Sequence, residues 1–479
     1  MIPHMTTSLI LAIDQGTHQS RAMLVDNRGR ICASSSMDIG LTRMDAKTVI
    51  QNPEAILHSV QRTVNGALAQ LGKLGQMVGA GMATQRSSIV AWDKQTGRAL
   101  SPVISWQDRR ADRWMSEFGS NADRVKHLTG LPLSAHYGAG KLRWLMDNVP
   151  NVKSAYRRGD LAWGPLASFL VHHLVQGSPY VVDDANAQRT LLWNLSSRQW
   201  DPWLCELFQI PSASLPECRP ISCAYGPLKT SEIPLVAVNG DQTAAFCGLG
   251  RPDAHTALIN MGSGAFVLFP TWNKPFHHEA LLSGIFKSDH GSREYVLEGT
   301  VNGAGTALTW AMEKWRMPDL FRDLPAWLFS DDDVPVFINA VGGLGSPWWR
   351  TDISSHLVGD GAPWQRAVAV VESIIFLLQA NIDTMRSLGA DIRRLNLTGG
   401  LSALDGLCQK LANLSQTPVY RPAETEATIR GISWQAFGEP RFWPKPGRGR
   451  HFTPVGDSDL HERYVRFSDM LKLILGESA

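Results

Sequence analysis

Residues 9–26 read LILAIDQGTHQSRAMLVD, two apolar segments joined by a short turn. Residues 9–13 are rich in Leu and Ile, and residues 21–26 are again mostly apolar. Two such segments separated by a Gly-containing turn are typical of a β-hairpin. A similar unit recurs at residues 257–269, where an apolar segment meets Gly262-Ser263-Gly264 and continues as AFVLF. Two hairpins placed roughly half a chain apart predict a protein with two related halves.

A second pair of matching segments supports this division. Residues 234–238 form an apolar segment that ends in Gly240-Asp241, and residues 395–397 form another that ends in Thr398-Gly399-Gly400. Each turn is followed by a helix-like segment, the later one at 403–414. In open α/β sheets, ligands bind at the carboxyl ends of the strands. We therefore expect both turns to face a ligand site, with the chain divided into domains at 1–250 and 251–479.

The composition of the 479 residues is that of a globular protein, with 44% hydrophobic and 19% charged residues. A formal net charge of +2 gives no global attraction to nucleic acid or to an anionic membrane. The six cysteines include no C-x-x-C pair and suit a reducing cytoplasm, and no signal peptide is predicted. Residues 367–382 are apolar but contain Glu372, so we expect a buried helix too short to span a bilayer. Residues 440–454 predict a surface loop before a final helix from about Ser458.

Several common nucleotide and hydrolase motifs are incomplete or missing. GAGKL at 138–142 lacks the first Gly of a Walker A loop and the Ser or Thr that should follow Lys141. GAGTAL at 303–308 lacks the third Gly of a dinucleotide fingerprint. Neither G-x-S-x-G nor H-E-x-x-H occurs. The sequence therefore argues against a P-loop enzyme, a Rossmann dehydrogenase and these two hydrolase classes.

The turns that are present have both a functional and an ordinary interpretation. Asp14-Gln15-Gly16-Thr17 can aim backbone N–H groups and a hydroxyl at a phosphate, with the Asp holding Mg²⁺ through water, or can be a simple hairpin turn. Asp241 at a strand end can act as a general base or metal ligand, or can cap a helix. Gly399-Gly400 allows a ligand close to a helix N-terminus, or forms a plain strand-to-helix turn. Residues 106–110, WQDRR, can bind a polyhydroxylated ligand or form a solvated charged turn.

Nine segments taken together resemble the FGGY carbohydrate kinases and, within that family, the glycerol kinases. The resemblance extends from Ile10 to about Phe467, and all nine segments occur in the family's order. The segments are IDQGTHQSRAMLVD (13–26), GMATQRSSIVAWDKQTGRAL (81–100), SWQDRR (105–110), TGLPLSAHYGAGKLRWLMDN (129–148), GDQTAAFCG (240–248), MGSGAF (261–266), LEGTVNGAGTALTW (297–310), GGLGSPWW (342–349) and LTGGLSALDGLCQKLA (397–412).

The resemblance implies a fold, a reaction and a cellular setting. The implied fold is α/β, with two actin-like (ribonuclease H-like) domains that close over a nucleotide and substrate cleft. The implied reaction is MgATP-dependent phosphorylation of a hydroxyl on a small polyol or sugar, in which the protein mainly positions groups and stabilises charge. The implied setting is cytoplasmic, with ATP and Mg²⁺ as cofactors, no nucleic acid or membrane partner, and a homodimer or homotetramer as candidate assemblies.

The resemblance also implies roles for individual residues. Asp241 matches the catalytic base, and Asp14, together with Asp241, matches the carboxylates that organise Mg²⁺ through water. The positions implied to contact ATP are Thr17, His18, Gln19 and Arg21 on the first phosphate loop, Ser263 on the second, and Gly305, Thr309, Gly400 and Leu404 around the nucleotide. The positions implied to line the substrate site are Arg86, Ser87, Trp106, His136, Asp241, Gln242 and Phe266.

The chain departs from the glycerol kinase pattern mainly in the substrate site. Gln85-Arg86-Ser87-Ser88 stands where glycerol kinases have Gln-Arg-Glu-Thr, and His136 replaces a Tyr unless Tyr137 takes its place. Loss of a hydrogen-bonding partner can change substrate preference by orders of magnitude. The resemblance makes glycerol the first single candidate substrate, and a ketose of the ribulose or xylulose type, or a longer polyol, is the alternative. Because of these departures we expect glycerol, if it is accepted, to be a poor substrate. A non-catalytic nucleotide-binding sensor or scaffold is the alternative from another class. Smaller departures are His18 for Thr, Leu404 for Asn and Arg350 for Asp.

Overall fold

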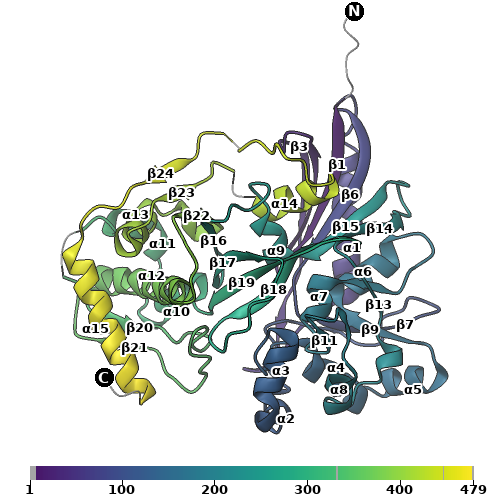
Figure 1. The fold of residues 1–479 in the computed structure, drawn as a ribbon, viewed down its shortest axis with the longest axis horizontal. Coiled ribbons are helices and arrows are strands. Elements are labelled where there is room, and N and C mark those ends of the chain that lie inside the picture. The colour runs from purple at the N-terminus through teal and green to yellow at the C-terminus, as the bar shows by residue number, and fades with distance from the viewer. Residues whose placement is uncertain (1–6, 331–332, 425, 446, 477–479) are drawn as a thin grey trace, which may run out of the picture.

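The computed structural model describes residues 7–330, 333–424, 426–445 and 447–476. Two large mixed sheets organise these residues, and they lie side by side in Figure 1. The first sheet has the order β14-β15-β6-β1-β2-β3, and the second has the order β18-β19-β17-β16-β22-β23-β24. The strands of the first sheet are β1 Ser8–Gln15, β2 Gln19–Asp26, β3 Ile31–Asp38, β6 Gln76–Thr84, β14 Ser222–Pro227 and β15 Pro234–Gly240. Those of the second are β16 Thr256–Met261, β17 Ala265–Trp272, β18 Leu282–Ser288, β19 Arg293–Val301, β22 Arg394–Thr398, β23 Val419–Arg421 and β24 Arg450–Phe452.

The two sheets repeat one pattern. In the first, β1 pairs antiparallel with β2 and parallel with β6. In the second, β16 pairs antiparallel with β17 and parallel with β22. Both hairpins predicted from the sequence are therefore confirmed, as is the duplicated α/β architecture.

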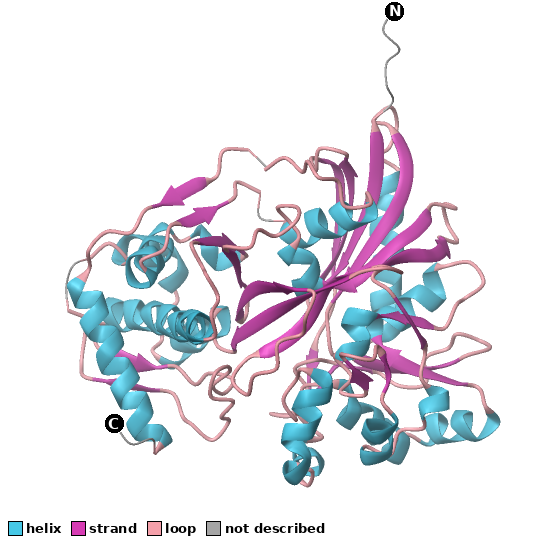
Figure 2. Ribbon diagram, viewed as in Figure 1, coloured by secondary structure: helices cyan, strands magenta, loops and turns pink. Residues whose placement is uncertain are grey.

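Smaller sheets and the helices surround these two sheets (Figure 2). The remaining strands are β4 Thr42–Arg43, β5 Val49–Gln51, β7 Ile89–Asp93, β8 Val103–Ile104, β9 Leu161–Pro165, β10 Val181–Asp183, β11 Trp193–Asn194, β12 Gln199–Trp200, β13 Glu217–Arg219, β20 Val336–Ile338 and β21 His356–Val358. The α-helices are α1 Pro53–Leu68, α2 Asp112–Ser116, α3 Ala122–Thr129, α4 Gly138–Asn148, α5 Pro150–Arg158, α6 Leu166–Leu174, α7 Asp184–Gln188, α8 Pro202–Leu207, α9 Asp241–Phe246, α10 Gly305–Lys314, α11 Leu320–Trp327, α12 Pro363–Ser387, α13 Asp405–Ser415, α14 Ala427–Ala436 and α15 Ser458–Leu475. The 3₁₀-helices of the described residues are η1 Gly119–Asn121, η2 Ser212–Ser214 and η3 Gly400–Ala403.

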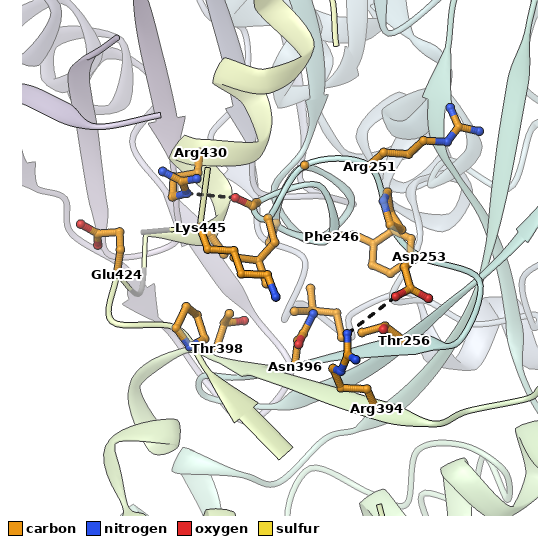
Figure 3. A pocket seen from close by; sticks show the side chains of 18 residues that line it. Phe246, Arg251, Asp253, Thr256, Arg394, Asn396, Thr398, Glu424, Arg430 and Lys445 are labelled. Carbon is orange, nitrogen blue, oxygen red and sulfur yellow. Dashed lines mark hydrogen bonds and ion pairs between the residues drawn. The ribbon is translucent and has the colours of Figure 1, made fainter. Parts of the chain in front are cut away.

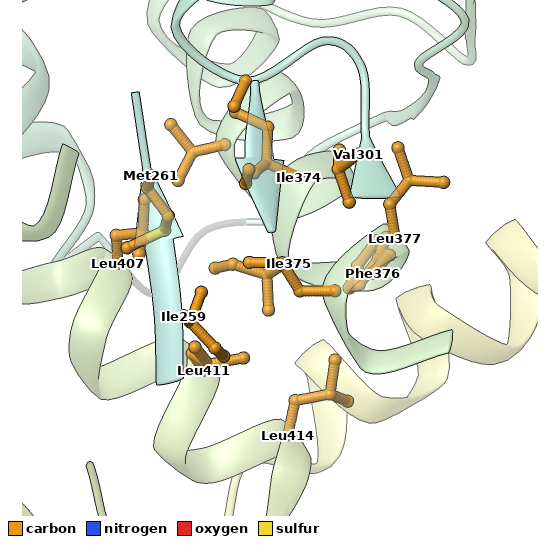
Figure 4. Packing of buried hydrophobic residues seen from close by; sticks show 14 of the residues in the cluster. Ile259, Met261, Val301, Ile374, Ile375, Phe376, Leu377, Leu407, Leu411 and Leu414 are labelled. Atoms are coloured by element: carbon orange, nitrogen blue, oxygen red, sulfur yellow. The ribbon is translucent and has the colours of Figure 1, made fainter. Parts of the chain in front are cut away.

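Helix α12 is the central helix of the second half. Its side chains Ile374 and Ile375 pack against Ile259 of β16 and Leu411 of α13 in one apolar cluster (Figure 4). By length and composition this 25-residue helix could cross a membrane, but 83% of its most apolar window is buried inside the protein. The predicted buried helix is therefore confirmed, although it is longer than the apolar segment that indicated it.

Helix α14 follows strand β23 of the second sheet in the chain, but it packs on the first sheet. It packs against β6 and β1 of the first sheet, where a Cβ on Gly81 would lie only 2.9 Å from a side-chain carbon of Ile432 (Figure 1). The chain then returns to the second sheet as β24. It thus passes between the two sheets three times, after α9, after β23 and after α14.

Two sequence predictions of secondary structure need correction. The segment 440–454 is not only loop, because its residues 450–452 form β24 on the edge of the second sheet. The helix expected over 403–414 begins at Asp405, because the 3₁₀ turn η3 comes first, right after Gly399 with its positive φ of 86°.

Candidate active site

Each central hairpin has a tight turn at the carboxyl end of its first strand, and the turn of the second half adjoins the start of α10. In the β1–β2 turn, the Gly16 N–H donates to the Gln19 carbonyl at 2.9 Å. In the β16–β17 turn, the Ser263 carbonyl accepts from the backbone N–H groups of Ala304 and Thr306, each at 3.1 Å. A Cβ at Gly305 would lie 2.8 Å from the Gly262 carbonyl oxygen, so only glycine fits this close approach. The second turn is therefore held directly against the N-terminus of α10.

Asp241 is the first residue of α9 and directly follows strand β15. Its side chain remains 25% exposed, and its Oδ1 lies 3.7 Å from Nε of Arg86. A Cβ at Gly240 would clash with the Arg86 stem at 2.6 Å, so this glycine lets the arginine pass close to the strand end. Burial raises the pKa of Asp241 to about 6, while the Arg86 charge opposes the rise. A carboxyl with such a pKa can accept a proton near neutral pH.

Asp14 lies at the end of β1 and is buried among charged neighbours. Arg21 on β2 bonds its carboxylate, and the other Nη of the same arginine lies 2.5 Å from Glu426. Burial raises the pKa of Asp14, and the Arg21 charge opposes that rise. The Asp14 charge in turn raises the pKa of Asp241, because the two carboxylates lie near each other.

A buried ion-pair cluster links the two halves beside Asp241. Glu298 on β19 accepts from Arg86 at 2.9 and 3.1 Å and from Arg189 at 2.7 Å. Burial opposes ionisation of Glu298, but the charges of Arg189 and Arg86 lower its pKa to about 2. The position of Arg86 is thus fixed by a carboxylate from the opposite half of the chain.

The substrate-site positions of the first half are connected by hydrogen bonds. Trp106 donates through Nε1 to the Thr17 hydroxyl at 2.9 Å, and its ring lies 5.8 Å from that of His136. Lys141 donates to the backbone carbonyls of Ser87 at 2.8 Å and of His136 at 2.7 Å. Lys141 therefore ties together the two segments that depart from the glycerol kinase pattern.

His136 has a defined protonation state in this arrangement. Burial lowers its pKa well below the usual value, and the charges of Arg109 and Lys141 lower it further. The neutral ring has Nδ1 at 3.4 Å from Nη2 of Arg109, which can only donate. The ring proton is accordingly assigned to Nε2, so His136 offers a donor at that atom.

The remaining predicted positions differ in how they are placed relative to this network. Gln242 accepts from Asn260 at 2.8 Å, and the Phe266 ring lies 5.9 Å from the Arg86 guanidinium. Thr309 bonds the Gly305 carbonyl on α10, and a Cβ at Gly400 would face open space, with no atom of the described residues within 4 Å apart from its neighbours in the chain. By contrast, His18 is exposed, Gln19 bonds Asp38 at 3.0 Å, and Leu404 packs against the apolar cluster of the second half.

Sequence reasoning missed four charged residues of this site: Glu298, Arg189, Glu426 and the buried Lys141. Glu298 stands in the segment LEGTVNGAG, but nothing local marks it as the partner of an arginine 212 positions away. Lys141 stands out in the sequence only as part of an incomplete Walker A loop. No such loop forms, because Lys141 lies in helix α4 and bonds two backbone carbonyls.

The pKa of Asp241 makes the pH dependence of the reaction predictable. If Asp241 must accept a proton, kcat/KM for the acceptor, which reports the pKa of the free enzyme, should fall as the pH drops through about 6, by about tenfold per unit below it. Arg86→Gln removes the charge that lowers this pKa, so the falling limb should move to higher pH. A kcat/KM profile that stays flat between about pH 5 and 7 would contradict this assignment.

The site and fold together define a kinase of the carbohydrate and polyol class. The FGGY family of carbohydrate kinases matches this chain through its N-terminal domain at residues 9–248 and its C-terminal domain at residues 257–437. The chain belongs to this family and is an ATP-dependent kinase of a polyol or sugar.

Individual relatives agree with this assignment. A glycerol kinase from Xanthomonas campestris pv. campestris (strain 8004) is 32% identical, covering 92% of this chain and 91% of the relative. A glycerol kinase from Acinetobacter baylyi is 33% identical over 90% of each chain. Plasmodium falciparum glycerol kinase with ADP has a TM-score of 0.86 at 23% identity, and Lactobacillus acidophilus xylulose kinase has 0.83 at 20%, with at least 98% of every chain covered. These structures confirm the two-domain actin-like fold.

Proposed function

We propose that Asp241 is the general base that removes the proton from the acceptor hydroxyl of a small polyol or sugar. The single observation that supports this role best is its position at the end of β15, with a pKa of about 6 and Arg86 at 3.7 Å. Arg86 and Gln242 contact this carboxylate, and the Phe266 ring lies 5.9 Å from the Arg86 guanidinium. Together with Trp106, these side chains are proposed to hold a short polyhydroxylated chain. Once the hydroxyl oxygen is deprotonated, it attacks the terminal phosphorus of ATP and ADP leaves.

The phosphate chain of ATP is proposed to lie between the two hairpin turns. Thr17, Gly16 and Arg21 are on the first turn and its strand, and Ser263 is on the second. The carbonyls of the second turn accept from backbone N–H groups at the N-terminus of α10, and the positive end of that helix's dipole favours an anion nearby. Gly305, Thr309 and Gly400 are proposed to border the nucleotide. His18, Gln19 and Leu404 are retained as weaker candidates because their side chains lie outside the bonded network.

The two carboxylates of the site fit a Mg²⁺ ion that is held partly by water. Among the described residues, no group of three or more His, Cys, Asp and Glu side chains could hold a metal. Mg²⁺ is usually bound by one or two carboxylates together with water and substrate phosphates, so Asp14 and Asp241 suffice. The ion would supply charge neutralisation at the phosphates, while Arg21 orients the Asp14 carboxylate.

The substrate side of the site is rich in hydrogen-bond donors. Arg86, Arg109, the Nε2–H of His136 and the Ser87 hydroxyl can all donate, and the hydroxyl is buried without a partner among the described residues. Because Ser87 stands where glycerol kinases have Glu, this position supplies no carboxylate to accept hydrogen bonds from substrate hydroxyls. A ketose carbonyl only accepts, so this arrangement favours a ribulose- or xylulose-type ketose over glycerol. The alternative is that Tyr137 supplies the missing acceptor and the chain phosphorylates glycerol well.

We further propose a cytoplasmic enzyme with a small-molecule substrate and no nucleic acid or membrane partner. Its domains are proposed to divide at residue 250, with α14 as the part of the second segment that covers the first sheet. A homodimer or homotetramer is the proposed assembly. A non-catalytic sensor is disfavoured because both Asp14 and Asp241 are present.

Ligand binding is expected to close the two domains. The turn at Gly16-Thr17 and the turn at 262–264 belong to different sheets, so one phosphate chain touches both only when the halves approach. Closure would also limit wasteful hydrolysis by excluding water. Small-angle scattering should give a smaller radius of gyration with a non-hydrolysable ATP analogue and substrate than with either alone. An unchanged radius would count against a moving cleft.

A further inference from the structure

A cavity of about 110 Å³ lies where the chain passes between the two sheets, and neither phosphate turn contributes to its lining. One wall is the end of α9 and the segment after it, residues 245–253. A second wall is the face of the second sheet that carries Arg394, Asn396 and Thr398. Pro422 and Glu424 precede α14, and Lys445 follows it. All three passages of the chain between the sheets therefore contribute to one cavity (Figure 3).

The charge of this cavity is positive. Four cationic side chains line it, Arg251, Arg394, Arg430 and Lys445, against the two carboxylates Asp253 and Glu424. Glu294 neutralises Arg251 at 2.8 Å from outside the cavity, which leaves a net charge of about one. The cavity thus lacks an anion to balance its lining.

Lys445 and Arg394 are the cations best placed to hold such an anion. Figure 3 shows the Lys445 side chain reaching into the cavity towards Asn396 and Arg394. Its ammonium lies 4.9 Å from the Tyr420 ring and has no carboxylate partner among the described residues. Arg394 forms an ion pair with Asp253 at 3.8 Å, but at this distance the pair includes no hydrogen bond, so the guanidinium N–H groups can still donate to an anion (Figure 3).

The other polar groups complete a small recognition site. The Oδ1 of Asn396 is buried without a partner among the described residues, and rotation of that amide would present its NH₂ group to an anion. Arg430 is 2% exposed and bonds the carbonyls of Gly248 at 3.0 Å and of Pro444 at 2.7 Å. It thereby fixes two of the three passages around the cavity.

We propose that this cavity binds a phosphate group, either free phosphate or the phosphate of a phosphorylated metabolite, and that the bound anion changes the kinase rate. A phosphate held by Lys445 and Arg394 would join the passage after α14 to strand β22. Helix α9 has Asp241 at its first residue and lines the cavity with Ala245 and Phe246 at its other end. An anion that fixes these segments relative to each other therefore acts on the placement of Asp241 and on the angle between the sheets.

Binding can be tested without relying on kinase activity. Inorganic phosphate is titrated into the full chain by calorimetry at constant ionic strength, with a non-hydrolysable MgATP analogue saturating the phosphate turns. We expect one site, weakened at least about tenfold in Lys445→Gln/Arg394→Gln, as loss of bonds to a charged group predicts. Lys472→Gln/Arg393→Gln is the matched control, because it removes one lysine and one arginine that lie outside the cavity, and it should bind phosphate normally.

Two further arms complete the test. Glycerol 3-phosphate replaces phosphate in the same titration, and tighter binding would identify a phosphorylated metabolite, whereas equal or weaker binding would identify free phosphate. The kinase rate of the natural chain should change when the cavity is filled, and the rate of Lys445→Gln/Arg394→Gln should not. Absence of phosphate binding, or equal affinity in the cavity variant, would overturn the site. Binding without any change in rate would overturn its coupling to catalysis.

Discussion

Asp241→Asn should reduce phosphoryl transfer by about 10²–10⁴-fold while leaving the fold and ATP binding nearly intact. The amide cannot take the hydroxyl proton, but its oxygen can still accept the bond that Asp241 now receives from the Gln242 N–H at 2.7 Å. The start of α9 therefore keeps its local structure. Initial rates with MgATP and the best acceptor measure the loss of phosphoryl transfer. The Tm and the Kd of a non-hydrolysable ATP analogue measure whether the fold and ATP binding are retained.

A control separates loss of the base from loss of a negative charge. Asp469→Asn removes a carboxylate from the exposed surface of α15 and should leave the rate unchanged. If purified Asp241→Asn kept more than about a tenth of the natural turnover, Asp241 would not be the base. The proposed Mg²⁺ role would then remain for this residue, because Gly240 and not Asp241 is the N-cap of α9.

Ser87→Glu should improve glycerol as a substrate by about ten- to a hundredfold in kcat/KM. The introduced carboxylate can accept hydrogen bonds from substrate hydroxyls beside Arg86. The neutral hydroxyl of Ser87 cannot form such charge-assisted bonds. A bond to a charged group contributes roughly 1.5–3 kcal/mol. Glycerol has too few atoms to recover that elsewhere, because binding energy per atom is limited to about 1.5 kcal/mol even for the best small ligands.

The comparison uses glycerol, erythritol, xylitol, ribulose and xylulose with the natural chain and two variants. Ser87→Gln is the matched control, because it adds the same length of side chain without the charge. For the natural chain we expect a higher kcat/KM with a ketose than with the alditol of the same length. For Ser87→Glu we expect a smaller ratio between these two values. The proposed preference for a ketose would be refuted if glycerol were the best substrate by a wide margin and Ser87→Glu did not improve it.

The sequence predicted the parts of the fold that depend on local patterns. The apolar segments around Gly16 and Gly262 indicated both hairpins, and the turn at Gly240-Asp241 indicated the end of a strand followed by a helix. Residues in contact within a hairpin or turn are close in the chain, so their pattern is visible in a short window.

The rest of the site depends on pairs that are distant in the chain. Arg21 meets Glu426 across 405 positions, and Arg86 meets Glu298 across 212. Neither glutamate differs locally from a surface residue, and a single sequence gives no sign of such pairing. The return of α14 to the first sheet was missed for the same reason, since it follows from packing against Gly81 rather than from its own composition.

The most direct test is observation of the phosphorylated product itself. The full-length chain, MgATP and each of the five acceptors are followed by phosphorus NMR, with Asp241→Asn and a metal-free sample beside them. We predict that a phosphate monoester of at least one acceptor appears together with equimolar ADP, only with Mg²⁺ present and only with the natural residue at position 241. Tight binding of the nucleotide without transfer to any of the five acceptors would contradict the account.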